Sequence, residues 1–231
     1  MPSRAKRPVR RLNVQPGRRS RAAPVRAKPA TRTEKLAITR AGILQSALEH
    51  FASFGFEGAS VRDIAAQACV NHGMIRHIYG TKEQLWREAI TFLFERLDQE
   101  VNLDAEIQAG LGDRELFTTY VHRYVRYCAR HPEHARIMIQ QSSRSGPTLE
   151  WATRRFVRAR HRVAGPIIER LVAQGILPGV DPLSLAFSLA ASCQMFFVLA
   201  PEIKSLAGRN VFSPAEVERH AQAVVQIFLR R

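Results

Sequence analysis

The side chains best suited to chemistry in this sequence lie between residues 60 and 82. His72, Arg76 and His77 fall within six positions, and Lys82 follows shortly after. Imidazole, guanidinium and ammonium groups donate hydrogen bonds to phosphate oxygens and to the edges of nucleic-acid bases. The sequence contains no nucleophile elbow, glycine-rich phosphate loop or metal cluster with usable spacing, so we expect neither catalytic residues nor a metal site. This set therefore favours recognition of a polyanion over catalysis.

Two short helices are needed to present these side chains. Ser60 begins a run like a capping box, with Asp63 three residues later, and Asn71 is placed to cap a second helix. Gly73 lacks a side chain where the backbone would come close to DNA. Six apolar residues would face inward and lock the helices together, namely Val61, Ile64, Ala65, Val70, Ile75 and Tyr79. The pattern predicts a helix-turn-helix whose second helix turns polar and basic side chains outward.

The net charge also indicates an anionic partner. The chain has 231 residues, a formal net charge of +15 and a sequence pI near 11.0, which predicts binding to nucleic acid or to an anionic membrane surface. Residues 1–33 hold 11 of the 35 basic side chains and no acidic one, so the remainder carries 24 basic and 20 acidic side chains, or +4. We expect this basic tail to be disordered. Its composition also resembles an organellar transit peptide, and that alternative stays open.

Cysteine usage and hydropathy bear on the compartment. Cys69, Cys128 and Cys193 are widely spaced and odd in number, which argues against a disulfide framework and favours a reducing compartment such as the cytoplasm. Residues 183–200 are uncharged and about as long as a minimal membrane span. Three serines spaced four apart interrupt this stretch on one helical face, as in a helix buried between other helices. We therefore expect no membrane partner.

The rest of the pattern is helical. Apolar residues recur with a helical period over residues 34–54, and Gly55 would end this helix in a left-handed cap. Thr81, with Gln84 three residues later, would cap a long helix. Further helices are expected at residues 113–130, 133–143, 148–174 (with a kink or break at Pro166), 182–200 and 214–230. The sequence therefore predicts an all-α fold, with a three-helix N-terminal helix-turn-helix domain followed by a helical-bundle regulatory and dimerisation domain.

A longer run of residues has the spacing of a known family. It consists of Ile43, Leu44, Ala47, Leu48, Phe51, Gly55, Phe56, Ser60, Val61, Ile64, Ala65, Ala68, Val70, Gly73, Ile75, Tyr79, Lys82, Glu83 and Leu85. This run resembles the DNA-binding domain of the tetracycline-repressor (TetR) family of bacterial transcriptional regulators. Three positions depart from that pattern, because Cys69 replaces the usual turn glycine, Arg76 a usual tyrosine and Ile78 a frequent polar residue. A left-handed Cys69 would carry a penalty from its Cβ atom.

The resemblance implies partners and residue roles. It implies a homodimer that binds a near-palindromic operator in double-stranded DNA and responds to an unknown small-molecule effector, most simply as a repressor. The implied phosphate contacts come from Ser60, Asn71, Arg76 and Lys82. The implied base contacts come from among Arg62, His72, Met74 and His77. Gly73, which has no side chain, would let the backbone approach the DNA beside them. A structural or nucleoid-type DNA-binding protein without ligand response is the alternative.

The chain divides into a basic tail at 1–33, a helix-turn-helix domain at 34–81 and a sensing and dimerisation domain at 82–231. No cofactor is expected. The aromatic residues that would line either the core or an effector pocket are Trp86, Phe92, Tyr120, Tyr124, Tyr127, Trp151 and Phe156. The last two predicted helices carry more apolar surface than a monomer needs, so we expect dimerisation through Leu185, Leu189, Phe196, Val217, Val224 and Phe228.

Overall fold

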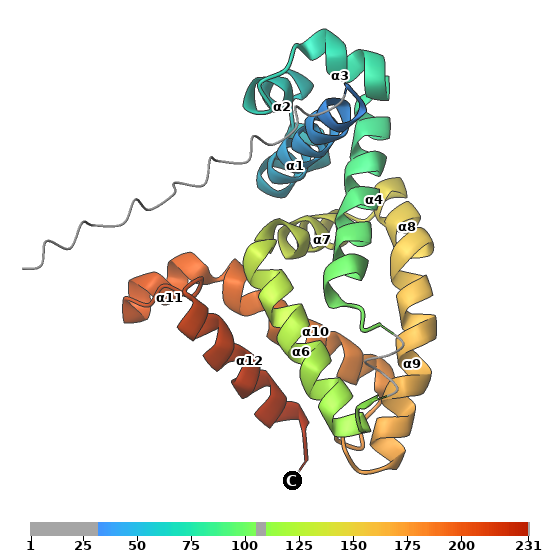
Figure 1. Cartoon of the computed structure of the whole chain (residues 1–231), viewed down its shortest axis with the longest axis vertical. Coiled ribbons are helices and arrows are strands. Elements are labelled where there is room, and N and C mark those ends of the chain that lie inside the picture. The colour runs from blue at the N-terminus through green and yellow to red at the C-terminus, as the bar shows by residue number, and fades with distance from the viewer. Residues whose placement is uncertain (1–31, 105–109, 231) are drawn as a thin grey trace, which may run out of the picture.

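The computed structural model of the chain describes residues 32–104 and 110–230, and no strand occurs among them. Its helical elements are α1 (Arg32–Gly58), α2 (Val61–Gln67), α3 (His72–Tyr79), α4 (Lys82–Val101), α6 (Asp113–Arg130), α7 (Pro132–Arg144), α8 (Pro147–Ala152), the π-helical turn η1 (Thr153–Val157), α9 (Arg158–Ala173), α10 (Pro182–Val198), α11 (Ala200–Ala207) and α12 (Pro214–Phe228). Figure 1 shows α1–α3 as a small head, from which α4 leads into a larger helical body. The predicted all-α class is confirmed. Most of the predicted tail, residues 1–31, lies outside the described residues.

The head forms because α1, α2 and α3 bury one shared set of apolar side chains. Leu48, Phe51, Ile64 and Ile75 are each at most 2% exposed. Full burial of a side chain of this size contributes about 1.5–3 kcal/mol. The chain leaves the helical conformation at Gly55, where φ is 71°. The helix is therefore broken at the predicted glycine, but the ψ of 176° lies outside the left-handed helical region, so the predicted left-handed cap is wrong in its geometry. The residues after Gly55 form a further short helical turn up to the end of α1.

Helix α4 starts from a complete capping box and joins the head to the body. The Thr81 hydroxyl accepts a hydrogen bond from the Gln84 backbone N–H at 3.1 Å, and the Gln84 side-chain oxygen accepts one from the Thr81 N–H at 3.0 Å. This is the cap that the sequence predicts. Helix α4 packs against α1 and α6, and α7 also packs against α1. Two body helices therefore set the orientation of the head.

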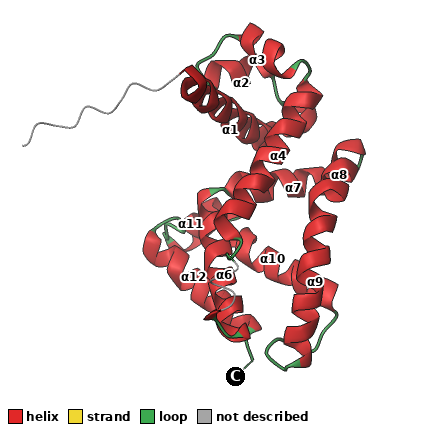
Figure 2. Cartoon of the chain, turned by 45° about the vertical axis from the view of Figure 1, so that its right-hand side comes forward, coloured by secondary structure: helices red, strands yellow, loops and turns green. Residues whose placement is uncertain are grey.

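The body is a set of helices packed around α6. Helix α6 contacts α12, α10, α4 and α7, whereas α9 packs against α10. Figures 1 and 2 both show α10 passing between α6 and α9. Val121, Cys193, Phe197 and Val224 are fully buried where these helices meet. The C-terminal end is held against the segment that follows α9, because the Arg230 N–H donates to the Ile176 carbonyl at 3.0 Å.

Two predicted helices differ from the observed ones. The single helix predicted at 148–174 is divided by the π-helical turn η1, and α9 continues without interruption through Pro166. Pro166 is exposed, so the carbonyl that loses its partner there can bind water. The helix predicted at 182–200 instead ends at Val198, because Pro201 opens a separate helix, α11.

No single described helix is long and apolar enough to cross a membrane, and the α10–α11 pair reaches that length only with a bend of 63°.

Candidate nucleic-acid interface and sensing region

Helix α3 presents its polar side chains outward, as the sequence predicts. His72, Arg76 and His77 are exposed, and Met74 is 42% exposed. On the opposite face Ile75 is 2% exposed and Tyr79 is 5% exposed. The inward and outward assignments on this helix are therefore confirmed. Val61 and Val70, also expected to face inward, are only half-buried at the edge of the same core.

The N-termini of α2 and α3 are capped by the residues that the resemblance assigns to phosphates. The Ser60 hydroxyl accepts a hydrogen bond from the Asp63 N–H at 3.4 Å, and the Asn71 side-chain oxygen accepts one from the Gly73 N–H at 2.7 Å. A Cβ atom at Gly73 would lie 3.1 Å from the same Asn71 oxygen. Glycine at position 73 is therefore favoured by the local structure as well, because a side chain there would crowd the Asn71 oxygen that caps α3.

The turn between α2 and α3 contains a residue in a costly conformation. Cys69 has a φ of 53°, in the region where an L-residue brings its Cβ atom too close to the backbone. The turn is closed by hydrogen bonds from the Cys69 N–H to the Ala66 carbonyl at 3.1 Å and from the Val70 N–H to the Ala65 carbonyl at 3.0 Å. The predicted Cβ penalty is therefore present, and the helix-turn-helix forms in spite of it.

Lys82 lies at a small recess between α3 and the start of α4. The recess has a volume of about 220 Å³ and is lined by Val61, His72, Ile75, Arg76, Gly80, Thr81 and Lys82. The Lys82 ammonium donates to the Glu57 carbonyl at 2.9 Å and lies 5.1 Å from the centre of the Phe56 ring. One of its three donors thus fastens the end of α1 to α4, and two stay available to an anion.

Arg40 is a basic group of the head that the sequence pattern does not identify. It is exposed on α1, and its guanidinium carbon lies 5.9 Å from the centre of the Tyr79 ring at the end of α3. Burial raises the pKa of the Tyr79 hydroxyl, and Arg40 opposes part of that rise. No sequence signal identifies Arg40, since it is one of many arginines near the N-terminus and its position depends on how α1 crosses α3.

A buried polar junction holds the head against the body. The Arg96 guanidinium donates to the Gln45 side-chain oxygen in α1 at 2.7 Å and to the Glu133 carboxylate in α7 at 2.6 Å. Burial alone would raise the pKa of Glu133, but hydrogen bonds from His131 and from its own backbone, together with the charge and hydrogen bond of Arg96, lower it to about 2. The Arg96 and Glu133 side chains are 13% and 8% exposed. This junction joins the head to α4 and α7 at one point.

Six of the seven aromatic residues predicted to line a pocket belong to two series of contacting rings, and both series end at His134. The first series runs from Trp86 through Trp151 and Phe156 to Phe94. The second series consists of Tyr120, Tyr124 and Tyr127. Trp86 and Tyr127 are fully buried, so they act as core. Phe92 is separate, because it lies against Arg96, with 5.4 Å between the guanidinium carbon and the ring centre. The sequence did not single out Phe94 or His134.

His134 is a buried, neutral group at the centre of this region. Its side-chain Nδ1 lies 2.8 Å from the Tyr127 hydroxyl, which also donates to the Leu93 carbonyl at 3.3 Å. Burial, and next the nearby positive charges of Arg160 and Arg96, lower the pKa of His134 to about 3. The imidazole therefore stays uncharged at neutral pH.

A second polar group lies between α6 and α10. The Gln194 amide donates to the Tyr124 hydroxyl, and burial raises the pKa of Tyr124 well above its usual value. Cys128 and Cys193 are buried close by, and burial raises the pKa of both thiols, that of Cys193 to about 12. These cysteines are therefore unreactive thiols. Among the described residues no group of three or more His, Cys, Asp or Glu is arranged to hold a metal ion.

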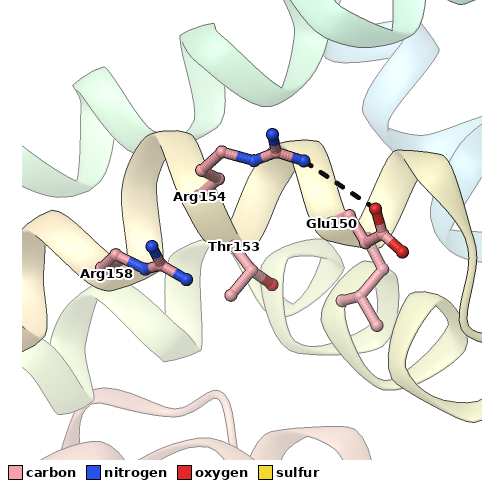
Figure 3. Close-up of a pocket in the computed structure, with 5 residues that line it drawn as sticks. Glu150, Thr153, Arg154 and Arg158 are labelled. Carbon is pink, nitrogen blue, oxygen red and sulfur yellow. Dashed lines mark ion pairs between the residues drawn. The ribbon is translucent and has the colours of Figure 1, made fainter.

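A shallow groove of about 550 Å³ runs along the outer side of α8, η1 and α9. It is lined by Leu149, Glu150, Thr153, Arg154 and Arg158. Figure 3 shows Arg154 directed toward Glu150, with 3.8 Å between the paired nitrogen and oxygen. Both partners of this pair are mostly exposed, at 70% and 71% of the side chain. Such a pair contributes little to stability, and the groove is open to solvent.

The residues predicted for dimerisation lie mainly inside one chain. Leu185, Leu189, Val217, Val224 and Phe228 are at most 9% exposed, and Phe196 is half-buried against His220. They pack α10 and α12 onto α6. The apolar groups that these helices leave open are Leu183 and Phe187 on α10, at 57% and 56%, and Ile227 on α12, at 68%. The apolar content of the two helices indicated a shared surface, but it did not distinguish the inward face from the outward one.

Comparisons with known proteins bear on this architecture. The family model described as "Bacterial regulatory proteins, tetR family" matches residues 43–89, and the model "YcdC-like protein, C-terminal region" matches residues 96–231. The transcriptional repressor NicS of Pseudomonas putida is 27% identical over 175 residues, which are 74% of this chain and 80% of that protein. The repressor Rv3405c of Mycobacterium tuberculosis is 38% identical over 93 residues, or 38% of this chain and 48% of that protein, so the chain spans about half the length of this relative.

A solved structure shows the same fold. AibR in complex with isovaleryl coenzyme A and operator DNA aligns with a TM-score of 0.65 at 18% identity, over 82% of this chain and 97% of that chain. The exposed α3, the three-helix head and the helical body define a helix-turn-helix protein with an all-helical C-terminal domain. Both family models match, one after the other along the sequence. The chain therefore belongs to the TetR family of bacterial regulatory proteins and carries a YcdC-like C-terminal region.

Proposed function

We propose that the protein is a cytoplasmic transcriptional repressor that binds a near-palindromic DNA operator as a homodimer and releases it when a small effector binds. The observation that carries this proposal is the outward set His72, Met74, Arg76 and His77 on α3, the second helix of the helix-turn-helix. A helix of this kind enters the major groove and reads base edges there. The relatives NicS and Rv3405c are named as repressors, which supports the direction of regulation.

The roles proposed on the DNA follow from where each group lies. We propose that His72, Met74, His77 and Arg62 of α2 contact base edges, which their exposure supports. We propose that phosphate is bound by Arg76 and Lys82, which line the recess at the start of α4, and by the helix N-termini capped by Ser60 and Asn71. Arg40 adds a further exposed guanidinium for the DNA backbone next to α3.

The proposed dimer uses the open face of α10 and α12. Leu183 and Phe187 lie one helical turn apart on α10, and Ile227 lies near the end of α12. Phe187 also stacks on His161 of α9, with 5.2 Å between ring centroids. We infer that these exposed apolar side chains belong to one surface that a second copy covers, since contiguous apolar patches on folded proteins mark interaction sites. A two-fold pairing of this face would bring two α3 helices to one DNA molecule. The buried Leu185, Leu189, Val217, Val224 and Phe228 would support the interface from below.

Dimerisation is tested by sedimentation of matched variants. Phe187→Glu places a charge on the open face, so the variant should stay folded and sediment as a monomer at micromolar concentration. Leu189→Glu is the matched control, because its side chain is 8% exposed within one chain and a charge there should unfold the protein. A Phe187→Glu variant that remains fully dimeric would rule out this face.

DNA binding is tested by selecting duplexes from a random pool with the purified full-length protein. Enrichment of a near-palindrome, with half-sites spaced by about one or more helical turns, supports the proposed operator. A structural DNA-binding protein without ligand response would instead retain duplexes of every sequence with similar affinity. That result would replace the proposed function with the alternative.

The effector is proposed to bind in the body, among the aromatic rings around α4, α6 and α9. AibR, which shares the fold, was solved with both an acyl-coenzyme A and operator DNA. In this chain Tyr120 is 37% exposed, and the rings of Trp151 and Phe156 are partly buried at the edge of the core. A ligand there acts only if it binds the two orientations of the head with different affinities.

A further inference from the structure

Helix α1 is attached to the body at two partly buried polar contacts. The Gln45 side-chain oxygen accepts a hydrogen bond from the Arg96 guanidinium of α4 at 2.7 Å, and the Ala52 carbonyl accepts one from the Gln140 amide of α7 at 2.7 Å. Gln45 and Ala52 are seven residues apart in α1. They therefore lie on one face of the helix, about 10.5 Å apart along its axis. A single contact would let α1 pivot, whereas two separated contacts restrain its angle on α4 and α7.

Arg96 anchors the first of these contacts to the body. A second nitrogen of its guanidinium donates to the Glu133 carboxylate of α7 at 2.6 Å, so one side chain joins α1, α4 and α7. The Arg96 and Glu133 side chains are 13% and 8% exposed, and burial to this degree is uncommon for charged groups. Glu133 is held in turn by His131, whose Nδ1 lies 3.5 Å from the same carboxylate oxygen. The body therefore determines where Gln45 finds its partner.

These contacts are better suited to fixing geometry than to adding stability. Desolvation of a buried ion pair offsets much of its attraction, and exchange of both partners for uncharged groups is often neutral. Among the described residues, Arg96 Nε and the Gln140 side-chain oxygen are buried without a hydrogen-bond partner, so the polar groups here are not fully satisfied. A hydrogen bond is lost when its donor and acceptor move apart by about 1 Å. Small displacements of α1 would therefore break both contacts.

The orientation of α1 sets the position of α3. Helices α1, α2 and α3 share one apolar core, in which Leu48, Ile64 and Ile75 are at most 2% exposed, so the head moves as a unit. In Figures 1 and 2, α7 lies at the top of the body, below this head. On an operator, the two α3 helices of a dimer must match both the separation of the half-sites and their rotation about the DNA axis. One base pair changes that separation by about 3.4 Å and that rotation by about 35°.

We infer that Gln45 and Arg96 are specificity-determining residues, which hold the head at one angle and so fix the half-site spacing that the dimer accepts. This inference rests on the proposed function and adds to it a property that α3 alone does not determine. The bases read within each half-site depend on the side chains of α3. The distance between the half-sites depends on the contact of α1 with the body. Each property can therefore be changed without the other.

The test measures discrimination between operator spacings. Full-length protein is titrated against the operator obtained by selection and against two versions with one base pair added or removed between the half-sites. Gln45→Leu keeps a side chain of similar size but accepts no hydrogen bond from Arg96. It should bind the selected operator about 10-fold more weakly, and its preference for that spacing should be about 10-fold smaller than in the wild type. A duplex with a single half-site should bind both proteins equally, since α3 is unchanged.

Gln141→Leu is the matched control. The side-chain oxygen of this α7 glutamine accepts a hydrogen bond from the Thr148 hydroxyl of α8 at 2.6 Å, so this bond lies wholly within the body. The control should discriminate between the three spacings as the wild type does. A double variant, Arg96→Met with Glu133→Gln, removes the anchor without leaving either partner of the ion pair charged and alone. It should lose discrimination as Gln45→Leu does.

The outcomes separate this inference from the proposed function. Wild-type discrimination in either Gln45→Leu or the double variant would overturn the inference, as would an equal loss in Gln141→Leu. Weaker binding of the single half-site by Gln45→Leu would also overturn it, because the change would then act on the head itself. A wild-type protein that selects an operator but binds all three spacings alike refutes the inference alone. A wild-type protein that selects no operator refutes the proposed function.

Discussion

Acid should destabilise this protein first through His134, before any of its buried carboxylates is protonated. The imidazole is 6% exposed, is held neutral beside the Tyr127 hydroxyl and has a pKa of about 3, against 6.5 for the group in an unfolded chain. Between these two values the unfolded state binds a proton that the folded state does not. A pKa lowered by folding therefore contributes stability that is complete above pH 6.5 and is lost as the pH falls toward 3.

The size of the effect follows from these two pKa values. Each pH unit below the unfolded value costs about 1.4 kcal/mol, so lowering the pH from about 7.5 to about 5 should remove about 2 kcal/mol through His134 alone. Glu133 also has a pKa lowered by folding, to about 2 from 4.5, so its contribution is lost only below about pH 4.5. The range from about pH 6.5 to 4.5 therefore separates the histidine from the carboxylate.

The assay is urea unfolding at the two pH values for the wild type and for His134→Asn. Asparagine keeps a polar atom near the Tyr127 hydroxyl but takes up no proton in this range. The variant should be less stable at pH 7.5 but should lose about 2 kcal/mol less on acidification than the wild type. His220, whose pKa is also lowered by burial, is common to both proteins and cancels in the comparison. Equal losses in the two proteins would refute the assignment of His134 as a neutral, desolvated group.

Three further predictions concern the head and the tail. Cys69→Gly should raise the free energy of unfolding by about 1 kcal/mol, because glycine adopts a φ of 53° without a Cβ penalty; no gain in urea unfolding would mean that the turn is unstrained. Lys82→Met should weaken binding to all DNA sequences alike and also destabilise the head, since it loses the hydrogen bond to the Glu57 carbonyl; a change in sequence preference would contradict this role. A chain that lacks residues 1–31 should show a shallower salt dependence of DNA affinity, by about 0.9 in slope per lost phosphate contact, with its sequence preference kept; equal slopes would remove the tail from binding.

The sequence identified the head well because its structure is determined by neighbouring residues. The caps at Ser60, Asn71 and Thr81, the break at Gly55 and the strained turn at Cys69 each depend on a few adjacent positions. The alternation of buried and exposed residues on α3 likewise follows from helical periodicity.

The body was predicted in outline only, because its polar groups are paired by tertiary packing. Arg96 meets Gln45 from 51 residues away, and Arg160 meets Asp98 from 62 residues away, and neither separation leaves a periodic signal. The π-helical turn η1 has no signature in the apolar pattern either. The predicted dimer residues of α10 and α12 are buried within one chain, because apolar content does not indicate which face of a helix is covered by its own chain.

Helix α3 is proposed to read the DNA sequence, and duplex selection with matched variants tests this role most directly. The wild type should enrich one near-palindrome. His77→Ala should change the preferred bases at symmetric positions in both half-sites, while Arg158→Gln, far from the head, should select the same sequence as the wild type. An unchanged preference in His77→Ala and in a parallel His72→Ala, with affinity lowered uniformly for every duplex or not at all, would contradict the claim.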